Sequence, residues 1–536
     1  MTGTAAAPQL DRTRRRAAVV QGIVAVLAGV MVALAFAPLR LWPLAIVGVA
    51  LFTWLVRQGE PARPLRRGTR WGYLMGLGLF VPLVGWIDVL GWYVAVALCG
   101  FMAVWGLLLG WGTAAVRHLP AWPLLTAALW SLAEFLSSRI PFGGFGWMRL
   151  GFTTADMPLG GFLPWLGVGG VSFLVALSGT LLAWGMERLR EPAPLRERLG
   201  RGLVPAGLVV AIAAAGLLAG LRPATPATGQ QVAVGMVQGN VDGTAGSGAM
   251  GYARSVTNNH LSETIMLMAK ARVGQTPLPE FVLWPENSTD VDPTRDRETH
   301  QLIGEAVLFA EVPIFVGSVM RGPGENERQT TGLWWHPDQG ITGRYDKRNL
   351  VPFGEYIPLR ETLLPLLPIL EQVGAQAVPG DQPGVLDVPL NEGRLRIGDV
   401  VCFELAWDTT VYDTARHRAQ LLVVQSNNAT YTATGQPRQQ FEITRVRAME
   451  LRRDIVVSTT SSFSGHIDPR GRVLDKTRES TAASATYLVD LRDGSTPAVT
   501  VGPWWEGIAA AIGALALLVG LTRELRRHRG GVGALE

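Results

Sequence analysis

The stretch AAVVQGIVAVLAGVMVALAFA, residues 17–37, decides the broad class of this protein. It contains 21 residues without a charged side chain, and a helix needs roughly 20 mostly apolar residues to cross a bilayer. Four arginines between residues 12 and 16 directly precede it. A cleaved signal peptide ending near Ala33 is the alternative interpretation. The apolar run is longer than a signal-peptide core, and more apolar stretches follow at once, so we interpret it as a first membrane span.

The composition of the whole chain agrees with this interpretation. With 536 residues, 48% hydrophobic and only 17% charged, the chain is too long for one ordinary domain and too apolar for a wholly soluble protein. Its net charge of +5 comes with arginines beside apolar runs, a pattern typical of membrane topology rather than of nucleic-acid binding. Seven further spans are predicted, at Leu41–Val56, Trp71–Leu90, Gly91–Val116, Ala121–Leu136, Leu163–Trp184, Leu203–Leu221 and Trp504–Leu521.

The distribution of arginines predicts which ends of these eight spans face the cytoplasm, because positively charged loops are retained there. Basic segments alternate with segments that hold little beyond Arg40, Arg139 and Arg149. The basic segments contain Arg12, Arg14, Arg15 and Arg16; Arg57, Arg63, Arg66, Arg67 and Arg70; Arg117 and His118; Arg188, Arg190, Arg196, Arg198 and Arg201; and Arg523, Arg526, Arg527 and Arg529. Both termini are therefore expected in the cytoplasm, and the polar segment before the last span outside it.

That polar segment reads as a globular α/β domain. Short β-rich runs are predicted at Gln231–Val237, Phe281–Trp284, Pro313–Val319, Leu395–Val401, Gln420–Gln425 and Ile455–Thr459, and helices near Tyr252–Ala271 and Phe441–Arg452. Several strands are nearly continuous apolar runs, as expected for a sheet covered on both faces. The expected domains are a membrane domain over 1–229, a globular domain over 230–495, and a last span with a basic tail over 496–536. The apolar, proline-broken stretch Leu359–Val378 suits neither a helix nor a strand and is interpreted as a mobile, lipid-facing lid or as plain packing.

One of only two cysteines lies in a setting that favours chemistry. Cys402 follows an apolar run in IGDVVCFELAWD, where a strand giving way to a turn would present its thiol at a sheet edge. A thiol becomes a strong nucleophile once ionised, although an isolated buried cysteine more often packs as a small hydrophobe. Cys99 lies in a predicted membrane span, so a disulfide within the chain would have to join the bilayer to the globular domain. Both thiols are therefore expected to be free.

Two other segments make a catalytic Cys402 the better interpretation. In FVLWPENSTD, a predicted strand leaves Glu286 at its end, where a carboxylate could act as general base for the thiol. In GRYDKRNLVPFGEYIP, Lys347 supplies a cation for a developing oxyanion, and Glu355 follows eight residues later. Either segment alone would be read as solvated polar residues.

Together these motifs resemble the Glu-Lys-Cys triad of the nitrilase superfamily. WPEN, YDKRNLVPFGEYIP and VVCFE occur in that order, and the three candidate residues are separated by 61 and 55 positions. The LVPFGEYIP element and the seven spans before and one after the domain more narrowly resemble the bacterial apolipoprotein N-acyltransferase family, as does PFGGFGWMRLGF between the fifth and sixth spans. The chain departs from the family pattern at Phe403, often tyrosine there, and at SNNATYT, where the family has a stretch like SNDAWFG.

The resemblance implies a fold class, a chemistry and partners. The fold would be a membrane bundle of about eight helices joined to an α/β nitrilase-like α-β-β-α sandwich domain. Glu286 would be the general base, Lys347 the stabiliser of the tetrahedral intermediate and Cys402 the acylated nucleophile, with Glu355 and Glu404 in support. Lys347 and the backbone N–H of Phe403 could together form an oxyanion hole. A membrane phospholipid would donate the acyl chain and a diacylated apolipoprotein would accept it, without metal or other cofactor, in a bacterial cytoplasmic membrane.

Three alternatives remain open at this point. A membrane-tethered amidase would use the same triad but pass the acyl group to water. A membrane scaffold, for example for a polyprenol-phosphate glycosyltransferase, would leave the globular domain inert. A Cys-His-Asn protease would need His417 or His466 to approach Cys402 in space. No metal-binding HExxH or CxxC spacing occurs, and the glycines of NVDGTAGSG lack the lysine of a phosphate loop.

Overall fold

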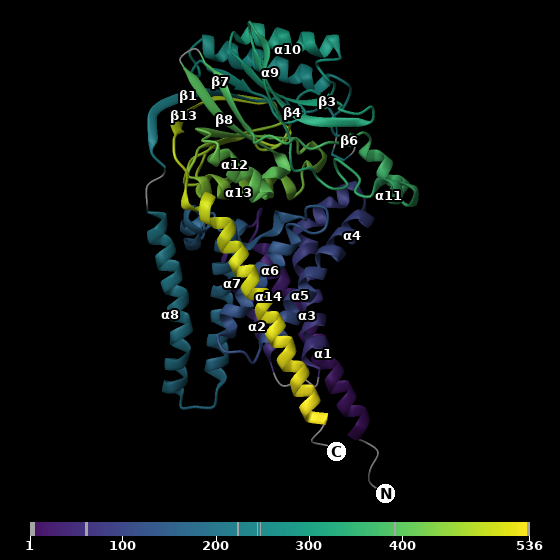
Figure 1. The fold of residues 1–536 in the computed structure, drawn as a ribbon, viewed down its shortest axis with the longest axis vertical. Helices are drawn as coiled ribbons and strands as arrows, with labels where there is room; N and C mark the ends of the chain where they lie inside the picture. The colour runs from purple at the N-terminus through teal and green to yellow at the C-terminus, as the bar shows by residue number, and fades with distance from the viewer. Residues whose placement is uncertain are drawn as a thin grey trace. The chain divides into compact units, whose positions relative to one another are not determined.

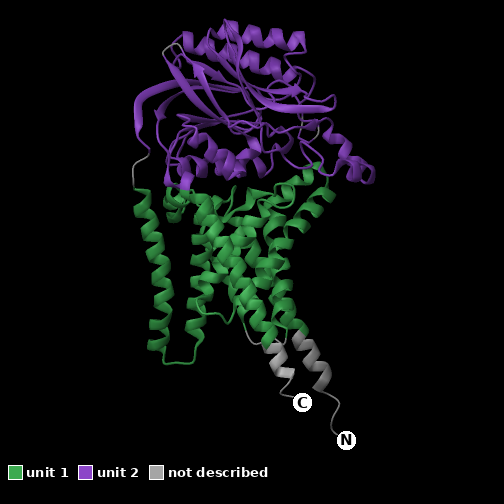
Figure 2. Cartoon of the chain, in the orientation of Figure 1, with its two compact units in different colours: residues 1–221, 501–536 green, residues 222–500 purple. Residues whose placement is uncertain are grey.

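The computed structural model describes residues 6–58, 63–221, 225–243, 245–246, 248–390 and 393–532. The chain forms two compact units, one of Met1–Leu221 with Val501–Glu536 and the other of Arg222–Thr500 (Figure 2). The side chains of Arg12, Arg14, Arg527 and Arg529, which belong to predicted basic segments, lie outside the described residues.

The first unit is a bundle of apolar helices (Figure 1). Its α-helices are α1 (Ala6–Leu34), α2 (Pro43–Arg57), α3 (Pro64–Val84), α4 (Trp92–Met102), α5 (Val104–Val116), α6 (Trp122–Ser137), α7 (Leu163–Arg190), α8 (Leu195–Gly220) and α14 (Pro497–Val532). Six described helical segments are long and apolar enough to cross a membrane: Arg15–Leu34, Pro64–Leu90, Trp92–Val116, Pro158–Arg190, Leu195–Gly220 and Pro497–Arg526. The other two predicted spans form the shorter helices α2, of 15 residues, and α6, of 16 residues. The expected multi-span bundle is confirmed.

Glycines allow the helices of this bundle to approach closely. A Cβ atom built at Gly72 of α3 would lie 2.0 Å from the carbonyl oxygen of Gly106 in α5, and one at Gly68 would lie 2.3 Å from that of Gly110. Because lipid provides no hydrophobic drive between helices, close packing of small residues is a main source of their association.

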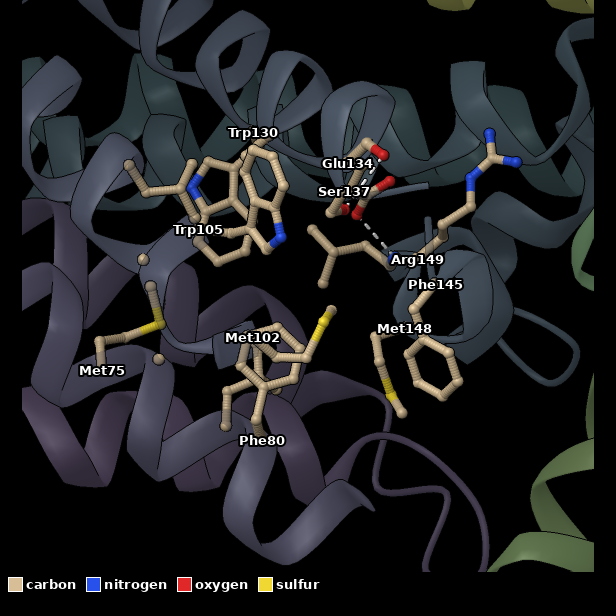
Figure 3. A pocket seen from close by; sticks show the side chains of 16 residues that line it. Met75, Phe80, Met102, Trp105, Trp130, Glu134, Ser137, Phe145, Met148 and Arg149 are labelled. Atoms are coloured by element: carbon tan, nitrogen blue, oxygen red, sulfur yellow. Dashed lines mark hydrogen bonds between the residues drawn. The ribbon is translucent and has the colours of Figure 1, made fainter. Parts of the chain in front are cut away.

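A polar cluster inside this unit ties α14 to the loop after α6. Glu506 of α14 accepts hydrogen bonds from Arg149 and Arg139, each at 2.7 Å, and Glu134 of α6 accepts one from the backbone N–H of Leu150 at 2.8 Å. Glu134 also lines a cavity of about 40 Å³ with apolar walls that include Trp105 (Figure 3). A cavity of this size has room for a few water molecules only.

The second unit is built on two sheets. The first has the strand order β13-β1-β2-β3-β4-β5, with β6 beside β4, and the second has the order β12-β11-β10-β9-β8-β7. The strands are β1 (Ala227–Gln238), β2 (Phe281–Leu283), β3 (Ile314–Arg321), β4 (Glu327–His336), β5 (Gly340–Asp346), β6 (Gln376–Ala377), β7 (Val385–Pro389), β8 (Arg394–Val401), β9 (Leu421–Ser426), β10 (Ile455–Thr459), β11 (Gly465–Ile467), β12 (Val473–Lys476) and β13 (Ala483–Arg492). All six predicted strands are present.

The two sheets pack face to face and are covered by helices on their outer sides (Figure 1). Buried side chains from both sheets, such as Phe281, Trp334, Ile397 and Val423, form one core. The helices of this unit are α9 (Ser255–Arg272), α10 (Arg297–Ala310), α11 (Arg360–Leu366), α12 (Asp408–Arg416) and α13 (Gln436–Leu451). Helices α9 and α10 cover the first sheet through a second apolar cluster, and α12 and α13 lie on the second. This is the expected α-β-β-α sandwich.

The direction of the strands brings several strand ends to one edge. β1, β2 and β3 pair in parallel in the first sheet, and β8, β9 and β10 pair in parallel in the second. Just past the ends of β1 and β10, the N–H of Asn240 donates to the carbonyl of Thr460 at 2.8 Å. The carboxyl ends of strands from both sheets therefore meet at the same edge of the sandwich.

The stretch predicted to suit neither helix nor strand, Leu359–Val378, contains both. Its first part forms the seven-residue helix α11, which includes Pro365, and its end forms β6, which pairs with β4. The prediction is wrong for these residues, because α11 is so short that Pro365, its next-to-last residue, removes at most one helical hydrogen bond.

Candidate active site

Glu286, Lys347 and Cys402 all follow the ends of strands. Glu286 comes three residues after β2, Lys347 directly after β5 and Cys402 directly after β8. The strand-to-turn transition predicted at Cys402 is present, because β8 ends at Val401 and a short 3₁₀ helix covers Cys402–Ala406.

Lys347 is the centre of the charged cluster. Its Nζ donates to Glu286 Oε1 at 2.9 Å and to Glu355 Oε1 at 3.0 Å. Its side chain is 2% exposed, so the ammonium group is almost removed from water and is held by two carboxylates. Such a buried ion is stable only when it is paired and hydrogen-bonded.

Glu286 is held from the opposite sheet as well. Its second oxygen, Oε2, accepts from the backbone N–H of Asn427 at 2.8 Å, and Asn427 directly follows β9. The two oxygens of one carboxylate thus receive hydrogen bonds from groups on different sheets, which fixes the orientation of the carboxylate.

Cys402 has a strained backbone. Its φ angle is +53°, in the left-handed region that residues with a Cβ rarely adopt, and such residues cluster at functional sites. Its Sγ lies 3.8 Å from Oε1 of Gln440 on α13. The residue is half-buried, so the sulfur is sheltered without being sealed off.

The electrostatics favour a neutral thiol and a charged lysine at rest. Burial raises the pKa of Cys402 well above its ordinary value, and the negative charge of Glu286 raises it further, while Lys347 lowers it. Burial acts to lower the pKa of Lys347, but Glu286 and Glu355 together raise it well above its ordinary value. A thiolate therefore forms only when a nearby base removes the proton.

The two supporting glutamates take different places. Glu355 contacts Lys347 directly and accepts from the N–H of Val351 at 2.7 Å. Glu404, fully buried, instead accepts from the N–H groups of Arg348 at 2.7 Å, Asn349 at 3.1 Å and Val401 at 2.9 Å, and from the Tyr345 hydroxyl at 2.9 Å. It joins the backbone after Lys347 to the backbone before Cys402.

Several polar residues near the thiol were not predicted from the sequence. Asn428 donates to Gln440 Oε1 at 2.7 Å, and Gln440 donates to the Ser426 hydroxyl at 2.5 Å. Burial raises the pKa of Tyr431 to about 12, and the charges of Cys402 and Glu355 contribute to the rise, which places its phenol beside the site. The one available signal was the unusual SNNATYT segment, which supplies Ser426, Asn428 and Tyr431.

Phe403 and two histidines complete the set of predicted residues. Phe403 is buried, at 5% exposure. His417 Nδ1 is hydrogen-bonded to the carbonyl of Asp413 at 2.9 Å, and His466 Nε2 to Asp454 at 3.0 Å, which gives no support to the cysteine-histidine alternative. Among the described residues, no three His, Cys, Asp or Glu side chains are grouped so as to hold a metal ion.

The chain is similar to known protein families. The family described as carbon-nitrogen hydrolase matches residues 234–495, and the family described as apolipoprotein N-acyltransferase N-terminal domain matches residues 28–181. A solved amidase of Nesterenkonia sp. AN1 from the nitrilase superfamily is 14% identical with a TM-score of 0.36, over 50% of this chain and 93% of that one.

Two curated relatives then narrow the class. The apolipoprotein N-acyltransferase of Mycolicibacterium smegmatis is 32% identical over 96% of this chain and 86% of its own length, and that of Nitrosomonas europaea is 29% identical over 92% and 95%. The chain belongs to the apolipoprotein N-acyltransferase family. Membership supports acyl transfer in general and a bacterial inner-membrane location. The names of these relatives give no support to the glycosyltransferase partner.

Proposed function

We propose that this protein transfers an acyl chain from a membrane phospholipid to the N-terminal amine of a diacylglyceryl-cysteine lipoprotein, through a thioester on Cys402. The observation that carries the proposal is the cluster in which Lys347 bridges Glu286 and Glu355 beside the thiol. Membership of the family and the apolar bundle, which would admit two lipid-anchored substrates, support it.

In the first half reaction Glu286 takes the proton of the Cys402 thiol as the sulfur attacks the ester carbonyl. Lys347 and the backbone N–H of Phe403 stabilise the negative oxygen of the tetrahedral intermediate, an interaction worth roughly 3 kcal/mol per preorganised donor. The intermediate collapses to a thioester, and Glu286 returns its proton to the departing oxygen of the lysophospholipid. The raised pKa of Cys402 fits this order, because the thiol keeps its proton until substrate arrives.

In the second half reaction the free amine of the lipoprotein attacks the thioester. Glu286 takes a proton from the attacking nitrogen, and Lys347 again stabilises the oxyanion. The C–S bond breaks, the sulfur recovers a proton from Glu286, and the N-acylated product leaves. A covalent intermediate between two substrates gives ping-pong kinetics.

The test is to trap the thioester. Purified protein is incubated with phospholipid carrying a labelled acyl chain, quenched, and examined for a hydroxylamine-sensitive label. The label should map to Cys402, disappear in Cys402→Ala and persist in the matched control Cys99→Ala. A label elsewhere, or none from any phospholipid, would refute the proposal. Adding a diacylated lipopeptide should move the label to its amine, whereas release of free fatty acid alone would favour the amidase alternative.

We also propose an orientation. Arginine-rich loops indicate that both termini are cytoplasmic and that the catalytic unit is outside, with a functional division into 1–229, 230–495 and 496–536. Protease added to intact spheroplasts should cleave the 230–495 segment and spare the termini. Cleavage only after lysis would overturn the orientation without affecting the chemistry.

A further inference from the structure

The second unit, Arg222–Thr500, contains a cavity that the proposed chemistry does not use. It has a volume of about 510 Å³ and lies between the turn that joins β3 to β4 and the segment 359–378. Three arginines line it: Arg321 at the end of β3, Arg328 on β4 and Arg360 at the start of α11. Ligand pockets for small molecules have volumes of this order.

These arginines lack ionic partners within the described part of the chain. None of the three has a carboxylate within ion-pair distance there, and Arg328 Nε donates to the carbonyl of Ala375 at 3.1 Å. Nη1 of Arg360 is buried with no described hydrogen-bond partner. A buried guanidinium N–H without an acceptor is costly, and an anion in the cavity would supply that acceptor.

Three glutamates also line the cavity, and they do not neutralise the arginines. Glu327 accepts from the N–H of Gly324 at 2.8 Å and so helps to build the turn. Glu325 and Glu371 are exposed. The half-buried charged residues that line the cavity are Glu327, Arg328 and Arg360. Of these, Glu327 already accepts a backbone hydrogen bond, which leaves the two guanidinium groups as the donors available to a ligand.

Exposed apolar side chains adjoin the arginines. Leu359 directly precedes Arg360, and Leu366, Leu367 and Ile369 follow on the same segment; their exposures are 66%, 70%, 48% and 42%. A group of guanidinium donors next to exposed leucines matches the two parts of a lipid, a phosphate and an acyl chain.

We propose that this cavity binds the phosphate of a phospholipid headgroup through Arg328 and Arg360, with Arg321 at the rim, while the apolar side chains of segment 359–378 contact the chains. The proposal rests on the proposed function in taking this lipid to be the acyl donor. Strand β4 links the cavity to the candidate active site, because Thr330 lies two residues after Arg328. The carbonyl of Thr330 accepts from the Lys347 N–H at 2.9 Å, and its hydroxyl donates to Glu355 at 3.5 Å.

The test measures binding without turnover. Full-length protein carrying Cys402→Ala, in an uncharged detergent, is titrated calorimetrically with dihexanoyl phosphatidylglycerol. Arg328→Gln and Arg360→Gln should each weaken binding about tenfold or more, the loss expected for a charge-assisted hydrogen bond. The matched control is Arg394→Gln, an exposed arginine paired with Asp387, which should bind as the parent does. Arg328→Lys and Arg360→Lys should recover part of the affinity, which separates lost charge from misfolding.

Two further ligands identify the source of the anion. Dihexanoylglycerol, which lacks phosphate, should bind equally weakly to every variant, and inorganic phosphate should bind much more weakly than the phospholipid. Unchanged phospholipid binding in both glutamine variants would overturn the proposal. Equal binding of inorganic phosphate would make this a free-anion site and overturn the lipid assignment. Because Cys402→Ala cannot form a thioester, these outcomes do not depend on whether acyl transfer occurs.

Discussion

Replacing Glu286 by glutamine should change two properties of Cys402 in opposite directions. The carboxylate is the proposed base that activates the thiol, and its negative charge also helps to raise the pKa of that thiol. Glutamine preserves the shape and, through its amide oxygen, the hydrogen bond from Lys347. It removes the charge and the acceptor of the Asn427 N–H. Acyl transfer from phospholipid should therefore slow, while direct reaction of the thiol with a small neutral alkylating agent should accelerate.

The magnitudes follow from the contacts. A positioned general base contributes about 10²–10⁴-fold to a rate, so thioester formation should fall by that factor. Two unit charges about 5 Å apart at an effective dielectric constant of about 20 interact by roughly 3 kcal/mol. Removing the carboxylate leaves Lys347 with Glu355 as its remaining anionic partner, at 3.0 Å. Because the thiolate is the reactive form, alkylation near pH 8 should become about 10–100-fold faster.

The assay uses a Cys99→Ala background, so that Cys402 is the only thiol. Iodoacetamide incorporation is followed by mass spectrometry between pH 6 and 10, alongside hydroxylamine-sensitive acylation. In the parent, alkylation should keep rising beyond pH 8.5, where an ordinary thiol ionises, because the pKa of Cys402 is raised. In Glu286→Gln the same curve should move to lower pH.

One result would refute this reasoning. If Glu286→Gln slows alkylation as well as acylation, then the carboxylate stabilises the thiolate or the local fold, and the neutral-thiol resting state is wrong. Asn427→Ala serves as the matched control, because its backbone N–H to Glu286 is retained, and it should leave the alkylation curve in place.

Three further predictions concern the same unit. Lys347→Met should leave the buried Glu286 and the half-buried Glu355 carboxylates without their cation and lower the free energy of unfolding by about 3–5 kcal/mol. Thermal unfolding should show this loss, and adding Glu286→Gln should restore part of it. Glu404→Gln should slow thioester formation tenfold or more in the labelling assay. The reason is that the amide N–H₂ of glutamine would face backbone N–H groups that now donate to the carboxylate. An unchanged rate would show that Glu404 does not position the site. Burial lowers the pKa of His260 to about 4, so between its ordinary value of 6.5 and about 4 the unfolded chain binds a proton that the folded chain does not. The free energy of unfolding should then fall with decreasing pH across that range by up to roughly 3 kcal/mol, and melting curves of His260→Gln should lack this contribution.

Local patterns were enough to predict much of the architecture. Hydropathy is read within one segment, so the apolar spans and the strands around Glu286 and Cys402 could be found without knowing their neighbours. The segment Leu359–Val378 shows the limit of such patterns, because its prolines and leucines did not reveal that α11 would form or that β6 would pair with β4. Pairing depends on a partner strand that local composition does not specify.

The amino-acid sequence alone determined the membrane-spanning class, the α/β character of the polar segment and the order of the three candidate residues, because each of these is a property of a short stretch. Only the tertiary structure decided that Glu355, and not Glu404, contacts Lys347. It also decided that the N–H of Asn427, 141 residues further along the chain, holds Glu286. The physical reason is that such contacts arise where the carboxyl ends of strands from two packed sheets meet at one edge, and strand register and sheet packing are set by the whole chain.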